Sequence, residues 1–137
     1  MIQEDYCSYE VAKLLKEKGF DAETNTYYYA TSEYTKSEMY KSPNNANWNS
    51  NEYYYSAPTH QMAMKWLREV HNKYCDIGYD IDLEWYFQTV DLKETVDYGC
   101  PEAKYYHSEN ETNFKTHEGA VEAALKYVLE NLILKKN

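Results

Sequence analysis

The sequence contains little glycine, proline or cysteine and has no long apolar run. Its 137 residues include 4 glycines, 3 prolines and 3 cysteines. There is no glycine-rich phosphate-binding loop and no nucleophile-elbow pattern, so the common nucleotide-binding and hydrolase motifs are excluded. No apolar run approaches the roughly 20 residues of a transmembrane helix. The first residues, Met-Ile-Gln-Glu-Asp, also lack the basic and apolar regions of a signal peptide.

The three cysteines, Cys7, Cys75 and Cys100, are an odd number without metal or redox spacing. This usage is typical of a reducing compartment. Together with the absence of a targeting segment, it predicts a cytoplasmic location.

Positive charge is also scarce. There are 14 lysines and arginines against 23 acidic residues, which gives a formal net charge of −9 and a sequence pI near 4.9. Binding to a nucleic-acid backbone needs clustered Lys and Arg, so this charge argues against direct nucleic-acid contact. It equally disfavours docking on an anionic membrane.

Aromatic residues are abundant. They make up 17% of the chain, and 17 residues are tyrosine. This content argues against a disordered polar chain despite a mean hydropathy of −0.89. The length suits a single domain spanning residues 1–137 with one core, and no repeat or linker divides it.

The clearest helix signal lies in residues 56–74. Ala63, Trp66, Leu67, Val70 and Tyr74 follow a 3.6-residue period on one face. We expect Pro58 just inside the start of this helix, and either Ser56 or Thr59 as its cap. Trp66 is predicted to lie at the centre of the core.

Two more helices are predicted, one near each end of the chain. The first begins at Asp5 or Ser8 and ends near Lys18, where Gly19 takes the left-handed conformation and Phe20 lies over Leu15. The last helix follows a Thr116 cap. Its apolar stripe comprises Val121, Ala124, Leu125, Val128, Leu129 and Leu132.

Residues 26–32 and 52–55 have the tyrosine and threonine content of strands. Between them, the asparagine-rich residues 42–51 are typical of a turn or mobile loop. We therefore predict a hairpin with a long tip. Tyr27 and Tyr29 face one side and Tyr28 the other, but the pattern does not say which side is solvated.

Residues 75–90 predict a second hairpin. Apolar side chains occupy odd positions, and a reversal near residues 80–82 is needed because one strand of this length would be unusually long. For Ile77 and Phe87 to share a face, the loop must hold an odd number of residues, either three or five. Gly78 is a candidate bulge. Residues 104–107 predict a further edge strand.

The order α-β-β-α-β-β-(β)-α indicates an α+β fold. We predict an antiparallel or mixed sheet of four to five strands, with the three helices packed on one face. The other sheet face is then available for the tyrosines.

Three helical segments, residues 8–21, 57–71 and 118–132, resemble small uncharacterised proteins of Bacteroidales prophages and other mobile elements. The most specific run is Pro58-Thr59-His60-Gln61-Met62-Ala63-Met64-Lys65-Trp66-Leu67-Arg68-Glu69. These proteins have no assigned activity, so no residue role is transferred. The resemblance implies a phage-like accessory protein.

No residue set predicts a cofactor, a metal site or a catalytic centre. His60 and His71 lie about 16 Å apart along a helix and cannot share a metal, and neither His107 nor His117 has a ligand partner at a recognisable spacing. Asp76, Asp80, Asp82 and Glu84 could attract a hard cation only if a turn brought them together. A solvated polar face explains them better.

The candidate binding residues are Tyr27, Tyr29, Trp48, Tyr53 and Tyr55. Tyrosine and tryptophan are enriched in binding surfaces, although sheet packing explains part of this excess. We favour a non-enzymatic module that binds an unidentified protein partner through this tyrosine-rich face or loop. One alternative is an acidic nucleic-acid mimic that inhibits a host defence protein. Another is a small hydrolase or nucleotide-binding enzyme in which His60 or His107 meets carboxylates in a deep pocket.

Overall fold

A computed structural model describes residues 2–30, 38–80, 84–92, 104–106 and 114–133. The helices are α1 (Tyr9–Glu17), α2 (His60–His71) and α3 (His117–Asn131). The strands are β1 (Thr24–Tyr29), β2 (Tyr40–Ala46), β3 (Tyr54–Ser56), β4 (Lys73–Tyr79), β5 (Trp85–Asp91) and β6 (Lys104–Tyr106), and a short 3-10 helix spans Trp48–Ser50. The fold is α+β, as the sequence predicts.

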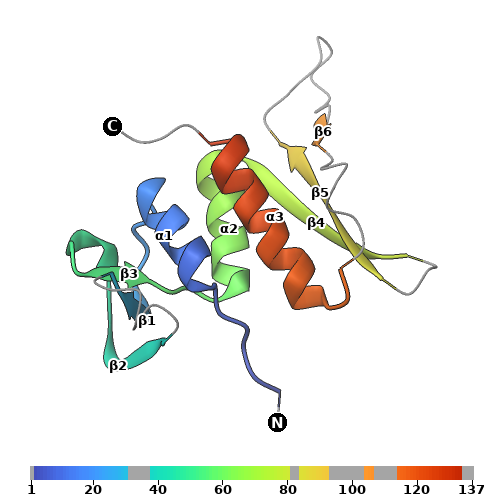
Figure 1. The fold of residues 1–137 in the computed structure, drawn as a ribbon. Coiled ribbons are helices and arrows are strands. Elements are labelled where there is room, and N and C mark those ends of the chain that lie inside the picture. Colours follow the sequence, from blue (N-terminus) through green and yellow to red (C-terminus); the bar gives the residue numbers. More distant parts are fainter. Residues whose placement is uncertain (1, 31–37, 81–83, 93–103, 107–113, 134–137) are drawn as a thin grey trace.

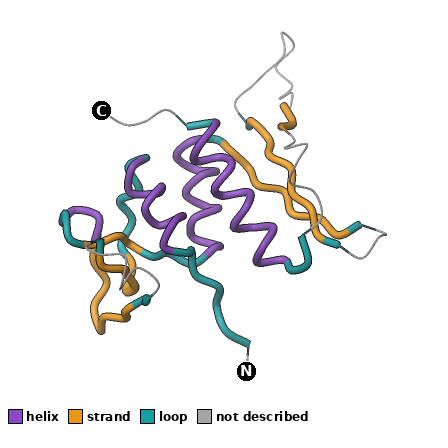
Figure 2. The backbone as a smooth tube through the Cα atoms, viewed as in Figure 1, coloured by secondary structure: helices purple, strands orange, loops and turns teal. Residues whose placement is uncertain are grey.

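The strands form two antiparallel sheets of three strands, with orders β2-β1-β3 and β4-β5-β6. The helices form a central group, with the first sheet beside α1 and the second beside α3 (Figures 1 and 2). The prediction of one sheet with all helices on one face is therefore wrong. Side chains occupy the outer edge of β3, where no strand of the described ranges pairs: the Ser56 N–H donates to Asn49 Oδ1 at 2.8 Å, and Lys16 Nζ donates to the Tyr54 carbonyl at 2.9 Å.

All three helices begin at a hydroxyl cap. Ser8, Thr59 and Thr116 each accept a hydrogen bond from the backbone N–H three residues later. Pro58 lies before the α2 cap rather than inside the helix, and its carbonyl accepts from the Cys7 N–H at 2.9 Å.

The C-terminal end of α1 is the predicted Schellman motif. Gly19 has φ 93°, and the Phe20 N–H donates to the Leu15 carbonyl at 2.9 Å.

The central helix is shorter than its sequence pattern suggests. It ends at His71 because Asn72 takes the left-handed conformation, with φ 57°, and the chain then enters β4. The predicted stripe fails at its C-terminal end, where Val70 is 55% exposed and Tyr74 is a strand residue that is 38% exposed. Met64 and His60 are buried on α2 instead.

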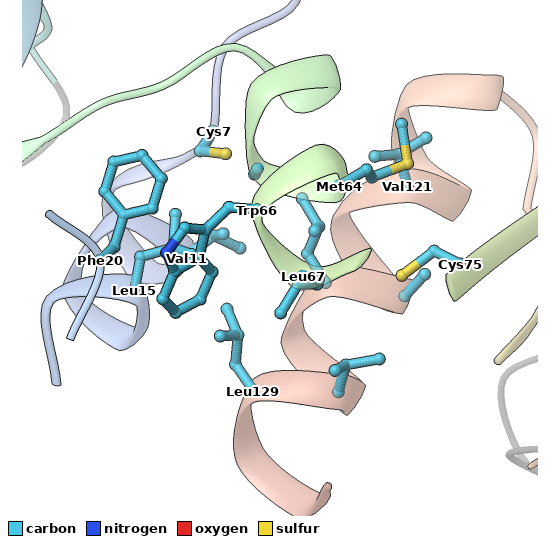
Figure 3. Close-up of a cluster of buried hydrophobic side chains, with 14 of the residues drawn as sticks. Cys7, Val11, Leu15, Phe20, Met64, Trp66, Leu67, Cys75, Val121 and Leu129 are labelled. Carbon is cyan, nitrogen blue, oxygen red and sulfur yellow. The ribbon is translucent and has the colours of Figure 1, made fainter. Parts of the chain in front are cut away.

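One apolar core joins the helices to the second sheet. Trp66, Leu125 and Phe87 belong to it, as predicted. The Trp66 ring meets Phe20 edge-on at 5.3 Å, and Figure 3 shows this pair beside Leu15, between α1 and α2. Cys75 of β4 belongs to the same cluster of buried side chains, so the core extends from the helices to the second sheet.

The second hairpin has the predicted parity. Tyr79 pairs with Trp85, so five residues connect the strands, and Ile77 pairs with Phe87 on one face. Gly78 does not mark a bulge, because the register is continuous and Gly78 pairs with Tyr86. A Cβ built on Gly78 would lie 2.2 Å from Tyr86 Cζ. The glycine therefore leaves room for the Tyr86 ring. The predicted further edge strand is β6, which pairs with β5.

Replacing Gly78 with alanine should displace the Tyr86 ring and lower the free energy of unfolding by about 1 kcal/mol. Urea unfolding of Gly78→Ala, Tyr86→Ala and the double variant measures this coupling. In the Tyr86→Ala background the same glycine change should cost nothing. An equal cost in both backgrounds would show that the ring is not the reason for the glycine.

Candidate functional site

The first sheet has an inner face toward α1 and an outer face that carries aromatic rings. Side chains of β1 alternate between them. Thr24, Thr26 and Tyr28 are buried on the inner face, and the Tyr28 hydroxyl donates to the Cys7 carbonyl at 2.7 Å. Tyr27 and Tyr29 therefore point outward.

Five rings meet on the outer face, and we call them the aromatic face: Tyr27, Tyr29, Tyr40, Trp48 and Tyr54. Tyr27 is at the centre, with ring centroids 4.5 Å from Trp48, 5.0 Å from Tyr54, 5.6 Å from Tyr29 and 5.9 Å from Tyr40. Tyr29 closes the cluster against Tyr40 at 5.0 Å and Tyr54 at 5.4 Å. All five side chains remain partly exposed.

Trp48 is fixed by the backbone beneath it. Its indole Nε1 donates to the Thr24 carbonyl at 2.7 Å. The next residue, Asn49, donates through Nδ2 to the Phe20 carbonyl at 2.9 Å and pairs with Ser56. The prediction of a turn or mobile loop over residues 42–51 is wrong for residues 42–46, which belong to β2, whereas residues 48–50 form a turn that is anchored to the sheet.

The structure brings together three of the five predicted binding residues: Tyr27, Tyr29 and Trp48. Tyr55 lies on the inner face, with its ring 5.4 Å from that of Tyr9 and with Lys16 Nζ 5.4 Å from its centroid. Tyr53 is 56% exposed and precedes β3. Tyr40 and Tyr54 were not among the predicted binding residues. The Tyr27–Tyr40 and Tyr29–Tyr54 pairings place them on the outer face, and a sequence pattern does not give this register.

Hydrogen bonds raise the pKa of two phenols on the aromatic face. The Tyr29 side chain raises the pKa of Tyr27 chiefly through a hydrogen bond. Glu38 acts on Tyr40 in the same way: the Tyr40 hydroxyl donates to Glu38 Oε2 at 2.7 Å, and this bond raises the pKa of Tyr40. The phenols of Tyr27 and Tyr40 therefore stay protonated to a higher pH than a free tyrosine.

Apart from the aromatic face, a polar cluster of Ser8, His60 and Glu122 connects the three helices. Glu122 of α3 accepts from the Ser8 N–H at 2.7 Å and from the Ser8 hydroxyl at 3.0 Å, and it lies 3.0 Å from His60 Nε2. His60 is buried. Ser8 is also the cap of α1, accepting from the Val11 N–H at 3.3 Å.

These three residues do not have the geometry of a nucleophilic triad. In a triad the imidazole accepts the serine proton and the carboxylate orients the imidazole. Here Glu122 is hydrogen-bonded to both Ser8 and His60, so Ser8 and His60 are not bonded to each other through this contact. The Ser8 hydroxyl also caps α1. A groove of about 810 Å³ between α1 and α3 includes Ser8, but His60 does not line it. The hydrogen bonds of Ser8, His60 and Glu122 therefore serve to link α1, α2 and α3.

Metal-binding chemistry has no support in the described residues, since no group of three or more His, Cys, Asp or Glu side chains there could hold an ion. His60 and His71 lie at opposite ends of α2. Asp76 accepts from Gln88 Nε2 at 2.7 Å on the neighbouring strand. His107 and Asp82 lie outside the described residues.

The described cysteines are poorly suited to nucleophilic chemistry. Cys7 and Cys75 are buried. Burial raises the pKa of the Cys7 thiol, and it raises the pKa of Cys75 to about 12. A high pKa suppresses the reactive thiolate. Cys100 lies outside the described residues.

No described helix is both long enough and apolar enough to cross a membrane.

Comparisons of the chain with protein-family models, curated proteins and solved structures find no match. Its function must therefore be inferred from the geometry of its own side chains.

Replacing Glu122 with alanine should lower the free energy of unfolding by about 1–3 kcal/mol, because buried His60 and Ser8 lose their shared acceptor. Denaturant unfolding measures the change. Glu130→Ala, at an exposed position of the same helix, is the control and should stay within about 0.5 kcal/mol of the parent. If the two variants lose equal stability, the cluster does not hold the helices together.

Stability should also fall as pH rises from about 9 to about 12. Burial raises the pKa of Cys75 from 9.0 to about 12 and that of Tyr28 from 10.0 to about 12. The unfolded chain releases these protons at lower pH than the folded chain, so their contribution is complete below pH 9 and is lost above it. Urea unfolding at pH 8 to 11 measures the slope. Cys75→Ala combined with Tyr28→Phe should reduce the slope, with buried Cys7 contributing to what remains, and an unchanged slope would contradict this assignment.

Proposed function

We propose that this chain is a non-enzymatic protein-interaction module that binds its partner through the aromatic face. The observation that carries the proposal is the set of five partly exposed rings on one side of a three-stranded sheet. Figure 1 shows α1 beside this sheet, and Tyr9 of α1 packs on the inner-face rings of Tyr28 and Tyr55. The short 3-10 helix that carries Trp48 lies on the outer side.

The rings suit recognition because they are already ordered. Trp48 is hydrogen-bonded to Thr24, and Tyr27 is packed against four other rings. A partner that covers such a surface pays little side-chain entropy and gains a large contact area from each ring. Tyrosine and tryptophan are also the residue types that most often dominate binding energy at protein interfaces.

The two alternative functions have weaker support. A nucleic-acid mimic needs a continuous acidic surface, but lysines lie among the carboxylates in the Glu10–Lys126, Lys65–Glu69 and Lys73–Asp91 pairs. A hydrolase with a covalent mechanism needs a nucleophile beside its histidine, and the described residues that line the small pocket at His60, of about 300 Å³, include no serine, threonine or cysteine. The prophage resemblance suggests a host or phage protein as the partner.

Affinity capture from a host lysate tests the proposal. A Tyr29→Ala/Tyr40→Ala/Tyr54→Ala variant removes three rings but keeps Tyr27 and Trp48, and it should capture at least about tenfold less of a specific host protein. Tyr74→Ala/Tyr79→Ala is the matched control. It removes two exposed tyrosines from β4 and should capture as much as the parent.

Circular dichroism melts establish that each variant is folded before capture. If the triple variant does not fold, the single change Tyr54→Ala replaces it, with a smaller loss expected. Equal capture by the parent, the ring variant and the control would refute the role of the aromatic face.

A further inference from the structure

The aromatic face has an uneven charge distribution. Strands β1, β2 and β3 contain one charged residue, Lys41. Lys41 pairs with the inward-facing Thr26, and its Nζ lies over the Tyr6 ring at 5.6 Å from the centroid. The only cation of these strands is therefore turned away from the aromatic face.

Carboxylates lie at two ends of this face. Glu38 is exposed, and its carboxylate accepts from the Tyr40 hydroxyl. Continuing the Tyr27–Tyr40 register places Glu38 opposite Tyr29, on the outer side. At the other end, the exposed Glu23 precedes β1 and has the same parity as Tyr27.

Both lysine–ring contacts among the described residues involve other tyrosines. Lys16 lies over Tyr55, and Lys41 lies over Tyr6. On the aromatic face, in contrast, the charged side chain in contact with a ring residue is a carboxylate, that of Glu38 at the Tyr40 hydroxyl. Rings combined with carboxylates are complementary to a cation, because the ring quadrupole and the negative charge attract it together.

We infer that the aromatic face receives an arginine-bearing segment of a basic protein partner, an inference that rests on the proposed function. Arginine fits better than lysine because its planar guanidinium stacks on a ring and also donates two parallel hydrogen bonds to a carboxylate. The net charge of −9 attracts a basic partner over longer distances.

Isothermal titration calorimetry with two synthetic 12-residue peptides tests this inference. One carries four arginines separated by Gly-Ser pairs, and the other has glutamine in place of each arginine. The arginine peptide should bind at least about tenfold more tightly than the glutamine peptide. Its affinity should also fall as the salt concentration rises. Equal affinity of the two peptides would overturn the inference.

Two charge variants separate this site from general attraction to an acidic chain. Glu23→Gln/Glu38→Gln leaves every ring in place and should weaken binding of the arginine peptide at least about threefold. Glu118→Gln/Glu130→Gln makes the same change of charge at exposed positions on α3 and should leave binding unchanged. Equal weakening in the two variants would mean that the peptide responds only to net charge, and the inference would be wrong.

Failure of the inference can be told from failure of the proposed function. If the ring variant loses its captured protein while the arginine peptide does not bind, the aromatic face recognises a neutral segment. Only the choice of arginine is then overturned. If the ring variant captures as the parent does, the proposed function itself fails.

Discussion

The inward position of Tyr28 determines the organisation of the first sheet. Its ring is buried against Tyr9 at 5.8 Å, and its hydroxyl meets the Cys7 carbonyl. Because strand side chains alternate, this one contact directs Tyr27 and Tyr29 to the opposite side. A register shift of one residue would bury two phenols that face outward and would expose Tyr28. The aromatic face therefore depends on how α1 packs.

The helices could be predicted because their signals are local. Ser8, Thr59 and Thr116 are hydroxyl caps at the start of apolar periodicity, and Gly19 with Phe20 gives the C-terminal motif of α1. The parity of the β4–β5 hairpin was predictable for a related reason, since alternation constrains the loop to an odd number of residues. Each of these features needs only neighbours in sequence.

In the first sheet, β1, β3 and their antiparallel pairing were predicted, but β2 was missed because its determinants are distant in sequence. The asparagine-rich composition of β2 is typical of a loop, and Pro43 is tolerated there because β2 is an edge strand. The Trp48 indole reaches back 24 residues to the Thr24 carbonyl. The end of α2 was misjudged for a different reason: Tyr74 continues the apolar period, but the left-handed Asn72 ends the helix before it. Side-chain periodicity does not reveal that change in backbone direction.

The excess of tyrosine serves both packing and recognition, and the two roles support each other. Tyr28 fills the interior, Tyr55 packs between Tyr9 and Lys16, and the outer rings pack on one another. A sheet of three short strands has little apolar surface of its own, so mutual ring contacts, including those of Trp48, stabilise its outer side. The same contacts hold each ring in place before a partner arrives. The cost of ordering the surface is thus met during folding, and the free energy of a later contact is available for binding.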